Sequence, residues 1–326
     1  MRIAVQAWSP EYGGEVEMGR LEASVEQVKT DCETGTWAPV TPRYSGGLLD
    51  APVAFVDGTR RIDARLFVSN GRSAPVAGLA GSVGAGSVVC TPPNGEAHGR
   101  AEIDELRVQR VLAVGGGTAV ALNGAGGLSY RSLPVPGESV EELTYAVHDT
   151  MRNLEAQLAQ ELADQGSLVF VDGPLAVMRP GPQRIVGFIK AHHRRYLEAD
   201  EEAVLGRLGC GERTPLFSFG EPRPRYSWYV RLCELADGDH DWHGLVRCEA
   251  PAALELDDVV SLADVSAILL VRFASLPYWD KRAPQNLVPV AGLERRLRHL
   301  LGDRDLVFRM IRDSAARTSE PSAVGT

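Results

Sequence analysis

The sequence predicts an α/β protein in which helices flank a mixed β-sheet. Apolar residues recur at every second position in "IDARLFV", which is typical of a strand with one buried face. Between Leu143 and Leu162, apolar residues recur instead at the three- and four-residue spacing of a helix. The continuous apolar run "SLVFV" follows this helix directly and indicates a buried strand.

Length and composition exclude several classes of protein. The 326 residues suffice for one large domain or two ordinary ones, and 44% hydrophobic with 24% charged residues is typical of a globular protein. No apolar run approaches the roughly 18 residues needed to cross a bilayer, and the start, "MRIAVQAWSPEYGG", lacks a signal-peptide cleavage site. The five cysteines are scattered without a CxxC pair. We therefore expect a cytoplasmic protein without a membrane partner.

The first half of the chain is predicted to be mainly β. Residues 1–50 form an N-terminal extension with an edge strand at "RIAVQAW". Strands are expected in "PVAFVDG", "IDARLFVSN", "AGLAGSVGAGSVVC" and "VQRVLAVGGGTAVALNG", joined by turns into an antiparallel meander. A long helix should then begin at the capping box of Ser139 and Glu142 and stop at Gly166.

The second half is predicted to mix strands and helices. We expect strands in "SLVFVDG" and "RIVGFIK", then a strand pair "SWYVRLCEL" and "HGLVRCEAP" joined by the turn "DGDHDW". Helices are expected within residues 259–276 and 287–303. The tail from residue 313 to 326 has little apolar content and is predicted to be disordered, which leaves 51–312 as the main domain.

The tetrapeptide FVDG occurs twice, and each copy carries an aspartate, Asp57 or Asp172, where an apolar run meets a glycine. If the two strands are neighbours, the carboxylates lie close and repel each other unless a proton or a cation is shared. Oxygen ligands of this kind suit Mg²⁺ or Mn²⁺. The alternative is that each Asp-Gly pair only forms a turn, which is a common use of this pair.

A third acid is expected from the long helix. At about 100° per residue, Glu155 and Glu161 fall on opposite shoulders of the apolar stripe, whereas Glu141 lies away from it. Either shoulder residue would reach the edge of the sheet. The alternative for both glutamates is a solvated position beside the buried stripe.

Basic and aromatic residues cluster although the net charge of −9 argues against nonspecific coating of nucleic acid. The clusters are "KAHHRRYL", "RPRYSWYVR" and "LERRLRHLLGDR". They either line a local basic groove or form solvated loops, with the aromatic side chains packed in the core. The candidate nucleic-acid-binding residues are His192, His193, Arg194, Arg195, Tyr226 and Trp228.

Several of these motifs together resemble the NurA family of nucleases, particularly its actinobacterial-type branch. They are "VDGT" with a β meander behind it, a helix with Arg152-x-x-Glu155, "LVFVDGPL", and "IVGFIKAHHRRYL", a strand that ends in lysine. The likeness extends from about Pro52 to about Arg312, and "DGPL" with the lysine strand is its most specific part.

The resemblance implies an RNase H-like core with a divalent-metal centre that prefers Mn²⁺. It also implies 5′-to-3′ exonuclease and single-strand endonuclease activity on DNA, a homodimer, and work with a HerA-type hexameric translocase on broken DNA ends. Carried over to this sequence, the metal-binding and catalytic acids are Asp57, Glu155 and Asp172, and Lys190 is the lysine that contacts the phosphate.

One feature departs from the family. Many NurA proteins carry a metal-site histidine near the C-terminus, but the comparable region "YWDKRAPQNLVPVAGLERRLRHL" has none before His299. Asp280 or Asn286 is expected to replace it as an oxygen ligand, with Asp280 the first choice. If neither does, the protein is a catalytically inactive adaptor that binds DNA and a translocase. A hydrolase of small phosphoesters is a third possibility.

Overall fold

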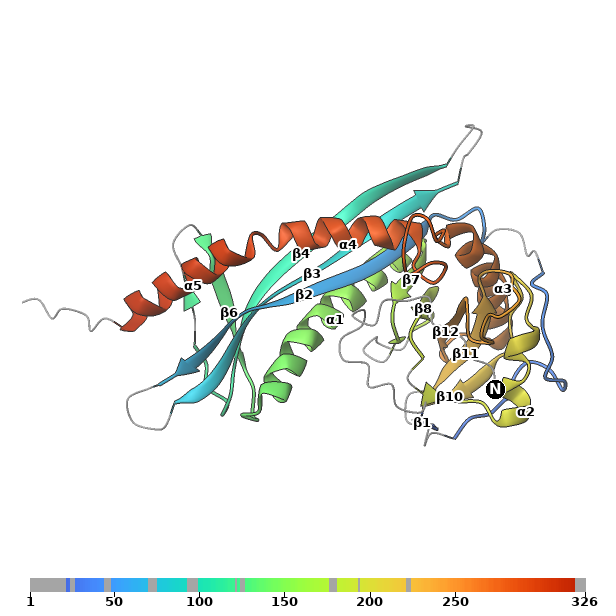
Figure 1. The fold of residues 1–326 in the computed structure, drawn as a ribbon, viewed down its shortest axis with the longest axis horizontal. Coiled ribbons are helices and arrows are strands. Elements are labelled where there is room, and N and C mark those ends of the chain that lie inside the picture. The colour runs from blue at the N-terminus through green and yellow to red at the C-terminus, as the bar shows by residue number, and fades with distance from the viewer. Residues whose placement is uncertain are drawn as a thin grey trace, which may run out of the picture. The chain divides into compact units, whose positions relative to one another are not determined.

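We describe a computed structural model of the chain (Figure 1). The described residues are 22–23, 27–43, 48–69, 75–92, 99–120, 122–123, 127–175, 181–192, 194–220 and 224–319. The edge strand expected at "RIAVQAW" lies outside them. Within these ranges, no helix combines the length and the apolar character that a membrane span requires.

The described residues form both strands and helices, as expected for an α/β protein. The strands are β1 (Glu22–Ala23), β2 (Val53–Val68), β3 (Val76–Thr91), β4 (Arg100–Val114), β5 (Leu122–Asn123), β6 (Ser129–Pro134), β7 (Leu168–Asp172), β8 (Ile185–Ile189), β9 (Arg194–Arg195), β10 (Phe217–Phe219), β11 (Arg225–Arg231) and β12 (Leu245–Pro251). The helices are α1 (Val140–Asp164), α2 (Ala199–Glu202), the 3-10 helix η3 (Leu205–Arg207), α3 (Leu256–Phe273), α4 (Val288–Leu300) and α5 (Arg304–Ser319).

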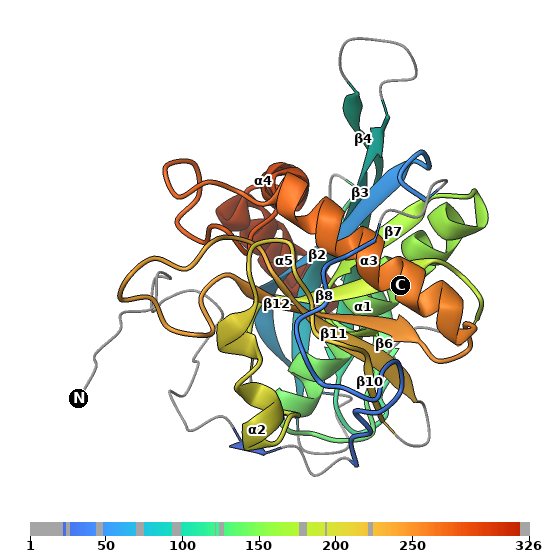
Figure 2. The same cartoon turned by 90° about the vertical axis from the view of Figure 1, so that its right-hand side faces the viewer.

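Ten strands form one mixed sheet in the order β10-β11-β12-β8-β7-β2-β3-β4-β6-β5. Its centre is parallel, because β7 pairs in parallel with both β2 and β8. The strand pair expected late in the chain is confirmed as the antiparallel pair β11 and β12. Helix α3 packs against β11 (Figure 2). On β11, Trp228 is fully buried and its indole Nε1 donates to Ser266 Oγ of α3 at 3.0 Å.

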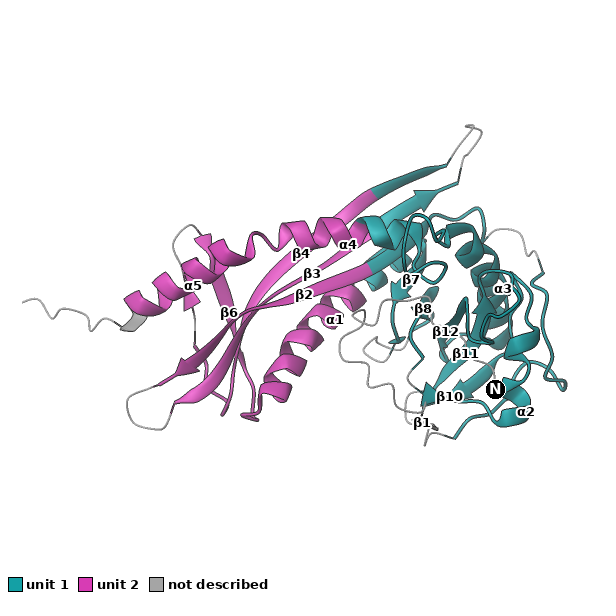
Figure 3. Cartoon of the chain, in the orientation of Figure 1, with its two compact units in different colours: residues 1–56, 88–102, 159–292 teal, residues 57–87, 103–158, 293–326 magenta. Residues whose placement is uncertain are grey.

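The chain divides into two compact units (Figure 3). Unit 1 comprises residues 1–56, 88–102 and 159–292, and unit 2 comprises residues 57–87, 103–158 and 293–326. The limits expected from the sequence, at residues 51 and 312, do not coincide with the limits of either unit.

The long helix of unit 2 begins and ends as predicted. Glu142 N donates to Ser139 Oγ at 3.2 Å and Ser139 N donates to Glu142 Oε2 at 3.1 Å, which is the expected capping box. Gly166, which follows α1, has a φ of 95°. The predicted stripe faces the core, since Leu143, Val147, Leu154, Leu158 and Leu162 are all buried.

Two expectations for unit 2 are wrong. The strands expected separately in "PVAFVDG" and "IDARLFVSN" form the single strand β2, because Asp57-Gly58 makes no turn and stays in extended backbone. The tail expected to be disordered from residue 313 is helical as far as Ser319. It is held because Ile311 is buried and Ser314 Oγ donates to the backbone oxygen of Asn123 at 2.6 Å.

In unit 1, a buried guanidinium is one of several contacts that hold the segment 27–43. Arg213 contacts Glu33 through two nitrogens, at 2.8 and 2.9 Å, and donates from Nε to Asp264 Oδ1 of α3 at 2.7 Å. Because Arg213 is 1% exposed, loss of either carboxylate would leave a buried charge poorly compensated.

Candidate metal centre

The first candidate acid lies on β2, beside the parallel partner strand β7. The register pairs Val56 with Val171, so Asp57 and Asp172 are the next residues of the two strands. Asp57 is 6% exposed, and its Oδ1 accepts a hydrogen bond from the N–H of Gly58 at 2.8 Å.

The second candidate acid, Glu155 of α1, lies against the glycine that follows Asp57. A Cβ placed on Gly58 would lie 2.4 Å from Glu155 Oε1 and 2.9 Å from Met151 Cγ. Glu155 is 7% exposed, so its carboxylate has little room to move away. Glycine at position 58 is therefore required for the close approach of this carboxylate, and not for a turn.

Asp172 is the last residue of β7, and the loop after it folds back onto β8. Gly173 has a φ of 112°, which favours glycine, and its N–H donates to Phe188 O at 2.9 Å. A Cβ on Gly187 of β8 would lie 2.6 Å from the carbonyl oxygen of Gly173. Two glycines thus allow the loop after Asp172 to lie directly on the neighbouring strand.

The same loop is held from a third side by a buried carboxylate. Glu249 of β12 is 1% exposed, and its Oε2 accepts the N–H of Leu175 at 3.0 Å. Arg225 and Arg247 compensate the charge of Glu249 at 3.2 and 2.7 Å. Glu249 therefore fixes the "DGPL" segment without touching Asp172 itself.

Lys190, directly after β8, forms an ion pair with Asp172. Its Nζ lies 2.5 Å from Asp172 Oδ2 and 3.3 Å from Asn286 Oδ1, and the two side chains of the ion pair are 10% and 17% exposed. A cation here compensates excess negative charge, or contacts a phosphate, as lysines do in phosphoryl-transfer sites.

Asp280 holds Asn286 and is itself held by Arg282. Asp280 Oδ2 accepts Asn286 Nδ2 at 2.6 Å, and Oδ1 accepts the backbone N–H of Arg282 at 2.9 Å. Burial raises the pKa of Asp280, but hydrogen bonds from Arg282 and Asn286 outweigh it, so the pKa lies below its ordinary value. Asp280, expected as an extra ligand, thus orients the amide that contacts Lys190.

One group of three carboxylates among the described residues is arranged to hold a cation. Asp57, Asp172 and Glu294 each offer one oxygen, and these oxygens lie within 4.8 Å of one another. Glu155 is not part of this group. Three carboxylates are hard oxygen donors, so the donor set fits Mn²⁺ or Mg²⁺.

Glu294 of α4 is the acid that sequence reasoning missed. It lies 14 residues after Asp280, which does not belong to the acidic group. The signal that points to it is helical spacing: Glu294 lies four residues after Val290 and three before Leu297, both of which are buried. An acid beside the buried stripe of an amphipathic helix requires a partner, and Arg298, one turn later, lies 3.7 Å from Glu294 Oε2.

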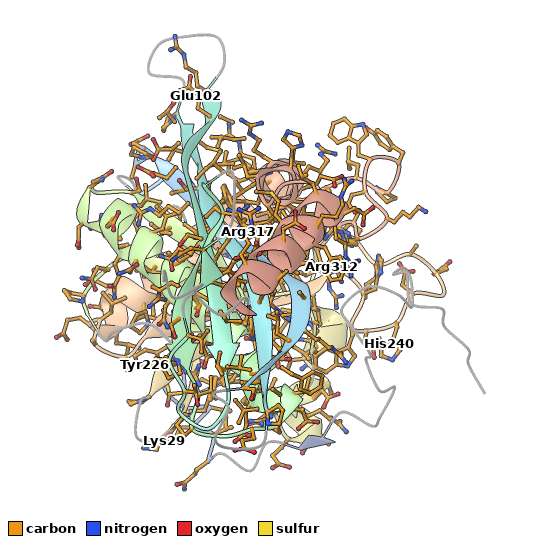
Figure 4. All side chains as sticks on the ribbon, turned by 90° about the vertical axis from the view of Figure 1, so that its left-hand side faces the viewer. Lys29, Glu102, Tyr226, His240, Arg312 and Arg317 are labelled. Atoms are coloured by element: carbon orange, nitrogen blue, oxygen red, sulfur yellow. The ribbon has the colours of Figure 1, made fainter. Side chains whose placement is uncertain are left out.

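Of the candidate nucleic-acid-binding residues that the structure describes, Trp228 is buried and the others are half-buried or exposed. His192 packs against Trp242 and its Nε2 lies 3.1 Å from Leu245 O, while Arg195 pairs with Glu202 through Nε at 2.8 Å. Trp228 belongs to the core and cannot stack on bases, because α3 covers it. The other three are Arg194, which is exposed, Tyr226, which is half-buried (Figure 4), and His193, which lies outside the described residues.

No protein-family model matches the sequence, and no curated protein matches it. The likeness to NurA nucleases therefore rests on the motifs alone.

Proposed function

We propose that this protein is a divalent-metal-dependent nuclease that cleaves DNA on an RNase H-like fold. The observation that carries the proposal is the convergence of three carboxylate oxygens, from Asp57, Asp172 and Glu294, within 4.8 Å. The sheet supports the RNase H-like assignment, because the long neighbouring strands β2, β3 and β4 are followed by α1 and by the parallel strand β7.

Each residue of the centre has a distinct part in this proposal. Asp57, Asp172 and Glu294 hold Mn²⁺ or Mg²⁺, which when bound lowers the pKa of a coordinated water and stabilises the leaving oxygen. Lys190 exchanges its contact with Asp172 for a contact with the scissile phosphate. Glu155 positions Asp57 by packing against Gly58, and Asn286 with Asp280 orients Lys190.

A cleavage assay tests this function directly. Purified protein is incubated with a labelled single-stranded DNA oligonucleotide and Mn²⁺, and the products are resolved by size. Wild-type protein and Asp237→Ala, which removes an exposed aspartate elsewhere, should both cleave. Asp57→Ala and Glu294→Gln should not. Equal residual cleavage in all four proteins would identify a contaminant and reject the proposal.

A second function, that of a non-hydrolytic DNA-binding adaptor, is favoured by one observation. The Lys190 ammonium already lies beside Asp172, where it supplies the positive charge that a metal would otherwise provide. An adaptor of this kind would bind DNA with no cleavage at any Mn²⁺ concentration, and Asp57→Ala would leave binding unchanged.

The partners implied by the family resemblance belong to the same proposal: a second copy of this chain and a HerA-type hexameric ATPase, acting in the cytoplasm on broken DNA ends. Light scattering on the purified chain tests the homodimer, and co-purification with the ATPase tests the second partner. A monomer at all concentrations would remove the homodimer from the proposal and leave the nuclease intact.

A further inference from the structure

Two adjacent aromatic side chains are exposed on the loop between α3 and α4. Tyr278 is 74% and Trp279 is 68% exposed, and their ring centroids are 5.1 Å apart with an interplanar angle of 67°. Aromatic side chains are usually buried for much of their surface, so neighbouring exposed rings mark a binding surface. We call Tyr278 and Trp279 the aromatic pair.

The backbone holds the aromatic pair in a fixed position. The loop is closed at its base by the bridge between Ala274 and Leu287, and Ser275 N donates to Asn286 O at 3.0 Å. Within the loop, Trp279 N donates to Leu276 O at 2.8 Å. The rings are therefore presented by an ordered loop, so a ligand would pay little entropy to order them.

Within unit 1, the same loop is linked to Asp172 through Lys190. Asp280, the residue after Trp279, accepts a hydrogen bond from Asn286, and Asn286 in turn accepts one from Lys190 Nζ, which pairs with Asp172. The aromatic pair is thus connected to Asp172 through three side-chain contacts.

The charges around the aromatic pair suit a polyanion. Arg282 contacts the carboxylate of Asp280 at 3.3 Å and compensates it, and Lys281 is exposed. Aromatic rings with a cation nearby are one arrangement by which proteins bind single-stranded nucleic acid, since every base has a stacking face and every nucleotide a phosphate.

We infer that the aromatic pair is a stacking site for unpaired nucleobases, with Lys281 contacting the adjoining phosphate. The inference rests on the proposed function in one respect only: the bound strand is taken to lead to the cleavage centre. Binding itself requires neither metal nor catalysis. The chemistry is common to unpaired DNA and RNA, and the experiment compares the two.

Fluorescence anisotropy with labelled oligo(dT) and oligo(rU), in EDTA so that no cleavage occurs, tests the inference. The double variant Tyr278→Ala/Trp279→Ala should lose roughly 5- to 150-fold in affinity for each stacked base. Tyr278→Phe/Trp279→Phe, which keeps both rings, should retain most of the affinity. Phe67→Ala is the matched control, because Phe67 is an aromatic residue of β2 that is 84% exposed.

An abasic oligonucleotide of the same length separates stacking from charge. It should bind wild type and the double alanine variant alike. The inference is overturned if the double alanine variant binds oligo(dT) and oligo(rU) like Phe67→Ala, or if its loss is as large on the abasic probe.

The two proposals fail in distinguishable ways. Ring-dependent binding by a wild-type protein that never cleaves would reject the nuclease and keep the stacking site. Cleavage by wild type with unchanged binding in the double alanine variant would keep the nuclease and reject the stacking site.

Discussion

The carboxylate of Glu155 occupies the space that a side chain at residue 58 would need. A Cβ on Gly58 would come within 2.4 Å of Glu155 Oε1, a separation that real structures essentially never show. Because Gly58 follows Asp57 in the same strand, any change that moves Glu155 is transmitted to the candidate metal ligand beside it.

Gly58→Ala should therefore destabilise the protein by about 1–3 kcal/mol, because an extra methyl group in a filled space forces its neighbours to move. Glu155→Ala in the same chain removes the clashing oxygen, so the double variant should recover part of the loss. Urea unfolding of the two single variants and the double variant measures this coupling. Strictly additive losses would show that the two residues do not contact each other.

Gly187→Ala should destabilise the protein more than Gly58→Ala does, with a loss of about 3 kcal/mol in the free energy of unfolding. The reason is that its Cβ would lie 2.6 Å from the backbone oxygen of Gly173. The loop after Asp172 would have to lift from β8. Gly35→Ala is the matched control, because a Cβ there meets nothing within 4 Å. Thermal unfolding compares the two, and equal melting temperatures would contradict the packing of this loop.

Lys190→Ala separates two roles of this lysine, namely contact with the scissile phosphate and compensation of the negative charge of Asp172. The variant removes the ammonium beside Asp172 and leaves Asn286 Oδ1 without this donor. We expect the variant to lose cleavage. Mn²⁺ should still raise its melting temperature, at least as much as that of wild type, because the three carboxylates repel one another without a cation. If Mn²⁺ stabilises neither protein, the adaptor function is favoured instead.

His148 of α1 should make unit 2 sensitive to acid. Burial lowers the pKa of His148 below its ordinary value of 6.5, and the nearby charges of Arg60 and Arg152 lower it further, although Asp149 opposes them. The unfolded chain therefore binds a proton first as the pH falls below 6.5, so the free energy of unfolding decreases with decreasing pH. Well above pH 6.5 the histidine is neutral in both states and contributes no pH dependence.

His148→Gln should remove this part of the acid sensitivity. Urea unfolding in EDTA at pH 7.5 and 5.5 should show a larger loss of stability in wild type than in the variant. An identical pH dependence in both proteins would mean that His148 titrates normally in the folded state.

The spacing of apolar residues predicted most of the helices and strands, because this spacing directly reflects which residues are buried. The stripe from Leu143 to Leu162 and the apolar run of β7 face the core, and the cap at Ser139 is local chemistry that a sequence displays. Asp57-Gly58 was misinterpreted as a strand end because this pair usually marks turns. Here its glycine makes room for Glu155, a contact between residues distant in the sequence.

Glu294 was missed for a related reason. It precedes Arg295 and Arg296, so the segment was interpreted by its charge, although helical spacing puts Glu294 beside the buried stripe of Val290 and Leu297. Sequence alone also could not decide which face of β11 is covered. Trp228, a candidate for stacking on DNA, is buried and donates a hydrogen bond to Ser266 of α3 instead.

The most direct test of the metal centre is anomalous diffraction from a crystal of the wild-type protein soaked in Mn²⁺. The account predicts one or two anomalous peaks in contact with carboxylate oxygens of Asp57, Asp172 and Glu294. A crystal in which these side chains are separated, or in which Mn²⁺ binds elsewhere and leaves Lys190 alone beside Asp172, would contradict it.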